Sequence, residues 1–349
     1  MNESNRALNV NNEVNQKIDI KNSKIAKWIK SGKGQKTLVI FSFMIIPILL
    51  LFTFTYLPFF KMIQFSFFDM KYIGPRNWVG LQNYVDVFQR DDCFKALKLS
   101  IYYMGGSFVQ LGIALFFASI LSFKTKGETV FKGAMFFPYL IGGIAVGFIF
   151  KFFYARGAVF DTILQAIGFD LNNLPYWLKN TSINNISLAA TSVWRYMGQN
   201  MVLFIGAIMS VDKELYEAAD IDGANKFQRF LYIMLPSIKT IVVLNLILSI
   251  TGSLSAFEPP YVITKGTMGT GTYFVIMNRI AHENQKVGLA SAMAIVLLVI
   301  LVVCTIAQKL VFNYWIDEEK KELRKAKKEK KLKQKINVQS KEVQINEGA

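Results

Sequence analysis

The residues that carry most enzyme chemistry are scarce in this chain. Its 349 residues contain a single histidine, His282, and two cysteines, Cys93 and Cys304, which lie far apart in the sequence. A catalytic triad needs a base beside a nucleophile, and a structural zinc site needs closely spaced cysteine or histidine pairs. The sequence shows neither pattern, so we expect no catalytic residue, no metal site and no cofactor bound by this chain.

Polar side chains inside otherwise apolar stretches are the better candidates for function. Where such a stretch crosses a membrane, its polar groups must face protein or water, because lipid offers them no hydrogen bonds. The candidates for lining a solute pathway are Trp194, Tyr196, Gln199, Asn200, Asn245, Ser249, Ser253 and Glu258. The alternative for each of them is a hydrogen bond to a neighbouring helix. Arg195 is expected to extend toward the outer membrane surface instead.

Composition indicates the kind of molecule that positions these residues. Apolar residues make up 52% of the chain and charged residues 18%, which is more apolar surface than a soluble core of this size hides. Much of the net charge of +16 lies near the two ends, at 17–36 and 320–341, and the middle has long uncharged stretches. A nucleic-acid binder would spread its basic residues over a folded face, so we expect no nucleic-acid partner.

Six stretches are long enough to cross a bilayer, which takes about 20 mostly apolar residues in a helix. They are residues 38–60, 99–123, 134–154, 186–211, 241–257 and 288–314. The sequence therefore predicts an all-α integral membrane protein whose transmembrane domain spans residues 38–314.

Basic residues at the ends of these stretches predict the orientation of the chain. Lysines precede the first span, lie between the second and third, and dominate the tail 315–349, so all three segments fall on one side if six helices cross. The side rich in lysine and arginine is the cytoplasm. We expect a disordered cytoplasmic arm at 1–37 and a basic cytoplasmic tail at 315–349 near anionic lipid headgroups.

The segment 212–240, between the fourth and fifth spans, differs from the other connections. Glu217 and the alanines after it begin a short helix, and Asp222-Gly223 supplies a turn, since glycine accepts a positive φ. A second amphipathic stretch follows, and Pro236 is expected to break it before the next span. The predicted helix-turn-helix faces the cytoplasm and has no catalytic constellation, so we interpret it as a docking element.

This segment resembles the EAA loop of ABC importer permeases, the inner membrane components of binding-protein-dependent transport systems. The residues in register with that loop are Glu217, Ala218, Ala219, Asp222, Gly223, Ala224, Phe230, Ile233, Leu235 and Pro236. Four further stretches resemble the carbohydrate-uptake branch, of the maltose and multiple-sugar type. They are 79–84, 194–198, 257–266 and 288–292. The resemblance extends from the first predicted span to the end of the sixth.

The resemblance implies a type I ABC importer permease fold and a role in moving sugar or oligosaccharide by alternating access. It implies a second, related permease subunit, two ATPase subunits that hold ATP and magnesium, and an extracellular solute-binding protein. The setting would be the inner membrane of a bacterium, with several passes and both termini in the cytoplasm. The loop around Glu217 would transmit movement of the ATPases to the helices. This chain has no Walker phosphate loop, so the nucleotide must be held by a partner.

Two other functions are left open at this stage. An ion-coupled secondary transporter would need buried carboxylates, and Glu258 is the only serious candidate in the spans. An ABC importer for a solute other than sugar is the second alternative. The family pattern has prolines at or near Asp212, Thr240 and Met268, where this chain has none. These departures affect the helix starts and the outer loop, and hence the solute.

Overall fold

The computed structural model describes residues 31–123 and 126–312. Most of the predicted arm, residues 1–30, and the whole of the predicted tail lie outside the described residues. Contacts divide the chain into two compact units, and the boundary between them along the sequence lies between Phe65 and Ser66. Each unit is described by itself.

The first unit is one long apolar helical run. It consists of α2 (Gly32–Leu51), the π-helical turn η1 (Phe52–Tyr56) and α3 (Leu57–Phe65). The run Val39–Phe65 is long and apolar enough to span a membrane, and none of the residues in its most apolar part is buried within the chain. A helix that is apolar on all sides requires lipid or other protein around it. This run agrees with the first predicted span.

The second unit is helical apart from one small hairpin. Its elements are β1 (Phe68–Met70), β2 (Arg76–Trp78), α4 (Gln82–Gln89), α5 (Asp91–Leu121), α6 (Glu128–Leu140), α7 (Gly143–Phe153), α8 (Val159–Ala166), η2 (Leu171–Asn173), α9 (Asn184–Met209), α10 (Lys213–Ile221), α11 (Lys226–Arg229), η3 (Phe230–Met234), α12 (Leu235–Leu254), α13 (Glu258–Val262), α14 (Tyr273–His282) and a last helix, Val287–Phe312. The strands β1 and β2 pair antiparallel. The all-helical prediction is confirmed, with this hairpin as the exception among the described residues.

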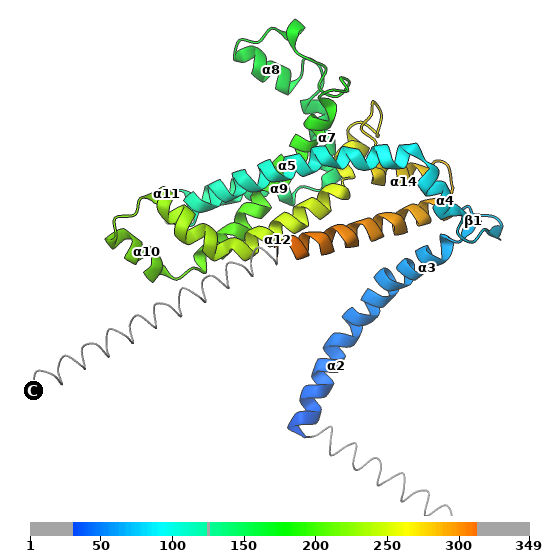
Figure 1. The fold of residues 1–349 in the computed structure, drawn as a ribbon, viewed down its shortest axis with the longest axis horizontal. Helices are drawn as coiled ribbons and strands as arrows, with labels where there is room; N and C mark the ends of the chain where they lie inside the picture. The colour runs from blue at the N-terminus through cyan, green and yellow to red at the C-terminus, as the bar shows by residue number, and fades with distance from the viewer. Residues whose placement is uncertain (1–30, 124–125, 313–349) are drawn as a thin grey trace, which may run out of the picture. The chain divides into compact units, whose positions relative to one another are not determined.

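Helices α5, α9 and α12 form the centre of the second unit and lie side by side (Figure 1). Ala114 and Ala118 of α5 are fully buried against Met201 and Phe204 of α9, in a cluster that also includes Ile238 of α12. Small alanines let two helix backbones approach closely, which is how helices associate where lipid removes the hydrophobic driving force. This packing fixes the three helices that carry the polar residues considered below.

The predicted number of six membrane spans is confirmed only in part. Among the described residues, four helices are long and apolar enough to cross a membrane, or five if the bent pair α6 and α7 counts as one span. That pair is bent by 98°, so the predicted span 134–154 is two helices. The predicted span 186–211 is helical, as α9, but α9 is not among these apolar spans. We attribute this to its polar residues, which include Arg195 and several amides.

Pro236 does not break the helix, so that prediction is wrong. The helical run continues from Lys226 through the π-helical turn η3 and α12 to Leu254. Proline lacks the N–H for an internal hydrogen bond, and its ring crowds the carbonyl four residues earlier. A π turn ends two residues before Pro236, as another does before Pro58. We attribute the continuity to the wider π turn, which relieves that crowding.

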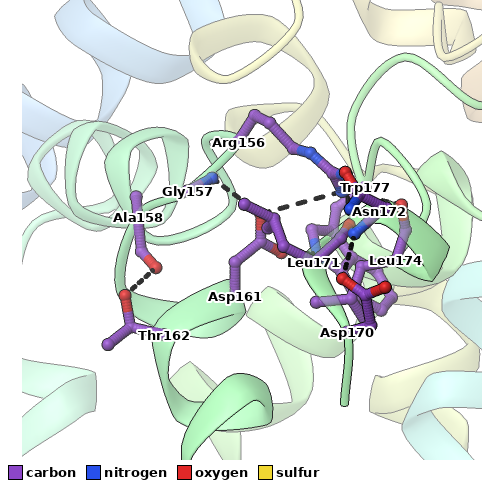
Figure 2. A network of polar contacts seen from close by, with 10 residues as sticks. All are labelled: Arg156, Gly157, Ala158, Asp161, Thr162, Asp170, Leu171, Asn172, Leu174 and Trp177. Carbon is purple, nitrogen blue, oxygen red and sulfur yellow. Dashed lines mark hydrogen bonds and ion pairs between the residues drawn. The ribbon is translucent and has the colours of Figure 1, made fainter.

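A polar network orders the segment between α7 and α9, as Figure 2 shows. Asp161 of α8 has a fully buried side chain and accepts hydrogen bonds of 2.7 Å from the indole Nε1 of Trp177 and from the backbone N–H of Gly157. The guanidinium of Arg156 lies 3.9 Å from the same carboxylate and donates to the carbonyl of Leu174 at 2.6 Å. A buried carboxylate is tolerated where it is paired and hydrogen-bonded in this way.

Candidate functional site

A cavity of about 480 Å³ lies among α5, α9, α12 and the first residues of α13. Its walls carry hydroxyl, amide and aromatic side chains in helices whose other faces are apolar. The lining residues are Tyr103, Ser107, Gln110, Ser192, Tyr196, Gln199, Asn200, Leu203, Asn245, Leu248, Ser249, Gly252, Ser253, Ser255, Ala256, Phe257, Glu258 and Pro259. The size and the mixture of apolar wall with placed polar groups are those of a small-molecule site.

Seven of the eight predicted pathway residues line this one cavity. They are Tyr196, Gln199, Asn200, Asn245, Ser249, Ser253 and Glu258. Their spacing explains the convergence, since Asn245, Ser249 and Ser253 recur every four residues and so share one face of α12. Trp194 is not among the lining residues, and its ring packs edge-to-face on Phe150 at 5.1 Å. The contact of these residues with solute stays a prediction.

Helix α5 contributes a wall that the sequence analysis missed. Tyr103, Ser107 and Gln110 line the cavity from α5, and each of them is more than 90% buried. Their separations of four and three residues put them on one face of a helix, beside the small residues that pack on α9. That spacing of polar residues within an apolar span was the available signal.

Several polar groups of the cavity wall have no hydrogen-bond partner in the described part of the chain. The amide of Asn245 donates to the carbonyl of Ile241 at 3.0 Å, and the hydroxyl of Ser253 donates to the carbonyl of Ser249 at 2.7 Å. In contrast, the side-chain amides of Gln110, Gln199 and Asn200 form no hydrogen bond to any residue that the structure describes. Unpaired amides at a cavity leave donors and acceptors free for water or a solute.

Arg195 forms an ion pair at the edge of this cavity. Its guanidinium donates to the Glu258 carboxylate and to the Tyr196 hydroxyl at 3.2 Å, and lies 5.0 Å from the Tyr196 ring centroid. The prediction that Arg195 extends toward the membrane surface is therefore wrong. Its partner lies 63 residues further along the chain, so the pairing could not be read from local sequence. Gly143 leaves room for the carboxylate, because a Cβ there would lie 2.2 Å from Glu258.

The predicted docking segment contains a tightly defined turn between two helices. Helix α10 ends in a Schellman motif. The N–H of Ala224 donates to the backbone carbonyl of Ala219 at 2.9 Å, and the N–H of Gly223 donates to the backbone carbonyl of Asp220 at 3.2 Å. Gly223 has a φ of +74°, which L side chains rarely adopt. The turn predicted at Asp222-Gly223 is thereby confirmed.

The second helix of the segment begins with a capping box. The Asn225 side chain accepts from the N–H of Gln228 at 2.9 Å, and the Gln228 side chain accepts from the N–H of Asn225 at 2.8 Å. An ion pair between Asp220 and Arg229 joins α10 to α11. Local hydrogen bonds and this pair therefore hold α10 and α11 as one element.

The docking residues predicted from the sequence differ in exposure. Glu217, Ala218, Asp222, Gly223 and Pro236 are exposed, Ala224, Phe230 and Leu235 are partly buried, and Ala219 is buried. Large apolar side chains are also exposed on the same segment, including Ile221 at 88% and Phe227 at 70%.

Helix α10 packs against the residues that directly follow α5. The Tyr216 ring packs edge-to-face on Phe123, with 5.6 Å between the ring centroids. Burial raises the pKa of Tyr216, and its hydroxyl has no partner among the described residues. This ring contact connects the exposed docking segment to a central helix of the unit.

No group of three or more histidine, cysteine, aspartate or glutamate residues in the described part of the chain could hold a metal ion.

Apolar spanning helices around a polar cavity, with an exposed helix pair between two of them, define a membrane transport subunit. The chain belongs to the family of binding-protein-dependent transport system inner membrane components, whose model matches residues 110–313. It is therefore a permease of the ABC transporter class, as the EAA-like segment predicted, and it lies in the inner membrane with several passes.

Several curated relatives and solved structures are similar to the chain, including the following three. The probable ABC transporter permease YesP of Bacillus subtilis is 32% identical over 276 residues, or 77% of this chain and 88% of the relative. The arabinooligosaccharides transport permease AraP of the same organism is 34% identical over 247 residues, or 68% and 77%. A bacterial ABC transporter involved in importing the acidic polysaccharide alginate has a TM-score of 0.70 at 20% identity, over 80% of this chain and 96% of that one.

The relatives confirm the predicted resemblance to carbohydrate-uptake permeases. The solved structure confirms the importer fold alone, because its sequence identity is low.

Proposed function

We propose that this ABC importer permease carries a sugar or oligosaccharide through the cavity among α5, α9 and α12. The observation that carries the proposal is a set of three amides, those of Gln110, Gln199 and Asn200, which have no partner among the described residues and lie at a cavity inside otherwise apolar helices. A carbohydrate presents many hydroxyl groups, each a donor and an acceptor, which can satisfy such amides during passage. Tyr196 adds an aromatic ring to the same wall.

The carbohydrate relatives support this substrate class. A permease named for arabinooligosaccharides aligns with two thirds of the chain at 34% identity. A solute of a different kind, the second alternative left open by the sequence, would have to use the same hydroxyl and amide wall.

The energy for transport comes, in this proposal, from ATPase subunits that grip α10 and α11. These helices present exposed apolar side chains, small alanines and the acidic Glu217, and they are held rigidly by the Schellman turn and the capping box. A rigid exposed pair of helices suits a cleft on a partner, because little conformational entropy is lost when it docks. ATP and magnesium are bound by that partner.

The structure suggests a path from the docked helices to the cavity. The helical run that begins at Lys226 in α11 continues through η3 and α12 to Leu254. It therefore joins the docking segment directly to Ser249 and Ser253 in the cavity wall. At about 1.5 Å per residue, a rotation or shift of α11 can be carried over tens of ångströms. Two packed arrangements of this helix, biased by nucleotide, would open the cavity alternately to each side.

The complete importer is proposed to contain a second, related permease, two ATPase subunits and an extracellular solute-binding protein. Both termini of this chain are proposed to lie in the cytoplasm, as the lysine distribution predicts, with the bent pair α6–α7 and the more polar helix α9 crossing the membrane besides the four apolar spans. The polar segment ordered by Asp161 then lies outside, on the side from which solute arrives.

The ion pair that Glu258 forms with Arg195 argues against the alternative of an ion-coupled secondary transporter. A secondary transporter needs a carboxylate that can bind and release a proton or sodium ion. Glu258 is the one carboxylate on the described cavity wall, and Arg195 already pairs with it. An ion would have to displace a guanidinium that is also held by Tyr196.

Reconstitution tests the proposed function. The permease pair, the ATPases and the binding protein are placed in liposomes, and uptake of labelled oligosaccharides is followed with ATP or a non-hydrolysable analogue inside. The proposal predicts uptake that needs hydrolysable ATP. Uptake driven by a proton or sodium gradient without ATP would contradict it.

A further inference from the structure

The ion pair between Arg195 and Glu258 presents its two charges unequally to the cavity. Glu258 is a lining residue with a side chain 40% exposed, whereas Arg195 is not a lining residue and its side chain is 14% exposed. The negative partner therefore faces the cavity, and the positive partner lies behind it.

Glu258 carries the only side chain charged at neutral pH on the described cavity wall. The remaining lining groups are hydroxyls, amides, aromatic rings and apolar side chains. A solute near this wall thus meets a carboxylate whose compensating cation is already engaged by Glu258 and by Tyr196. No free cation on this wall can attract an acidic solute.

The position of the carboxylate is fixed by three elements. Arg195 holds it from α9, its own backbone begins α13, and Gly143 of α7 passes so close that a Cβ would lie 2.2 Å from it. A carboxylate held in one place acts as an oriented acceptor. It has about four lone-pair sites, of which the guanidinium uses a part.

We propose that Glu258, positioned by Arg195, makes this cavity select uncharged hydroxyl-rich solutes and disfavour solutes that carry carboxylate groups. The inference rests on the proposed function, because it assigns a charge preference to the proposed solute cavity. Hydroxyl groups of an uncharged sugar donate to Glu258, whereas the carboxylate of a uronic acid is repelled by it. The solved importer of similar fold imports an acidic polysaccharide, so the fold leaves this choice to the side chains.

Reaction of a cysteine placed in the cavity measures this preference without any need for transport. Ser249 lines the cavity and is replaced by cysteine in the assembled transporter, with Cys304→Ala in the background and the buried Cys93 retained. Methanethiosulfonate reagents of similar size, bearing a sulfonate, a hydroxyl or a trimethylammonium group, are applied in turn. The reaction rate of each reagent at Ser249→Cys is divided by the rate of the same reagent with a small free thiol in solution.

The expected result follows from the sign of the charge that is left. The sulfonate reagent reacts more slowly than the hydroxyl reagent when the ion pair is intact. Glu258→Gln leaves Arg195 unpaired, and the ratio of the sulfonate rate to the hydroxyl rate rises by about tenfold, as expected for one charge removed at ~5–8 Å in a partly screened site. Arg195→Gln leaves Glu258 unpaired and raises the ratio of the trimethylammonium rate to the hydroxyl rate instead.

A matched control uses the ion pair between Arg279 and Glu283, which lies outside the cavity. Glu283→Gln removes the same charge and should leave all three ratios at Ser249→Cys unchanged. A sulfonate ratio that is unaffected by Glu258→Gln, or one above unity with the pair intact, would overturn the inference.

Uptake of a labelled uncharged trisaccharide and a labelled triuronate, each with a binding protein that accepts it, separates the two proposals. Faster uptake of the triuronate would overturn the charge preference. If ATP drives uptake of neither sugar while the thiol ratios behave as expected, the carbohydrate assignment fails and the charge preference of the cavity stands.

Discussion

Replacement of Gly223 by valine tests the backbone of the docking turn. Gly223 closes the Schellman motif with a φ of +74°, and a Cβ built there meets no atom within 4 Å. A clash with neighbours therefore does not contribute, and the cost is the conformational cost of an L residue in the left-handed region. That cost is about 1–2 kcal/mol, with β-branched valine at the upper end.

A penalty of about 1.4 kcal/mol reduces the population of the docking geometry about tenfold. We expect Gly223→Val to assemble with its partners but to show about tenfold lower solute-stimulated ATP hydrolysis and uptake. Gly223→Asn should stay within about twofold of the parent protein, because asparagine tolerates this region. Gly168 also has a positive φ and open space around its Cβ, so Gly168→Val is the matched control outside the segment.

The assay is co-purification with the ATPase, followed by uptake into liposomes. Uptake at the parental rate for Gly223→Val would refute the reasoning. Equal losses for the asparagine and valine variants would assign the effect to side-chain bulk rather than to backbone conformation.

Three further changes test other parts of the account. Glu217→Lys reverses an exposed charge on α10 and should weaken ATPase binding by about 1 kcal/mol, or about fivefold in Kd; an unchanged Kd would count against an acidic docking face. Ser253→Phe fills the cavity wall and should abolish uptake with assembly intact, whereas Leu244→Phe, on an exposed face of α12, should not; normal uptake by the former would remove α12 from the pathway. Asp161→Ala removes the buried carboxylate that accepts from the partly buried indole N–H of Trp177 and should cost about 1–3 kcal/mol of stability, seen as protease sensitivity of the segment between α7 and α9; parental resistance would argue against this network.

Local chemistry accounts for what the sequence predicted well. The turn at Asp222-Gly223 depends on one glycine and a few neighbouring backbone groups, so its position could be predicted from two residues. The polar face of α12 could be predicted because a spacing of four residues is a property of one helix. All six predicted spans are helical for the same reason.

Interactions distant in sequence account for what could not be predicted. The pairing of Arg195 with Glu258 could not be predicted, because Glu258 lies 63 residues further along the chain. The spacing of Tyr103, Ser107 and Gln110 predicts a shared face of α5, but only the packing of α5 against α9 and α12 brings that face to the cavity. Trp194 shared a polar stretch with Tyr196, yet residues two apart on a helix point about 200° apart.

Two features depended on backbone geometry beyond the usual rules. The helix break expected at Pro236 is avoided by a π turn, which propensity alone does not predict. The bend of 98° between α6 and α7 divides a stretch that reads as one apolar span.

The central claim is that the segment of α10 and α11 lies in the cytoplasm and binds the ATPase. Ile221 is 88% exposed on this segment and serves as the site of a single reactive cysteine, Ile221→Cys, in a Cys304→Ala background. A membrane-impermeant maleimide is applied to intact cells and to inside-out vesicles, with and without the ATPase. The account predicts labelling only in inside-out vesicles and protection by the bound ATPase. Labelling in intact cells would contradict the topology and the coupling role together.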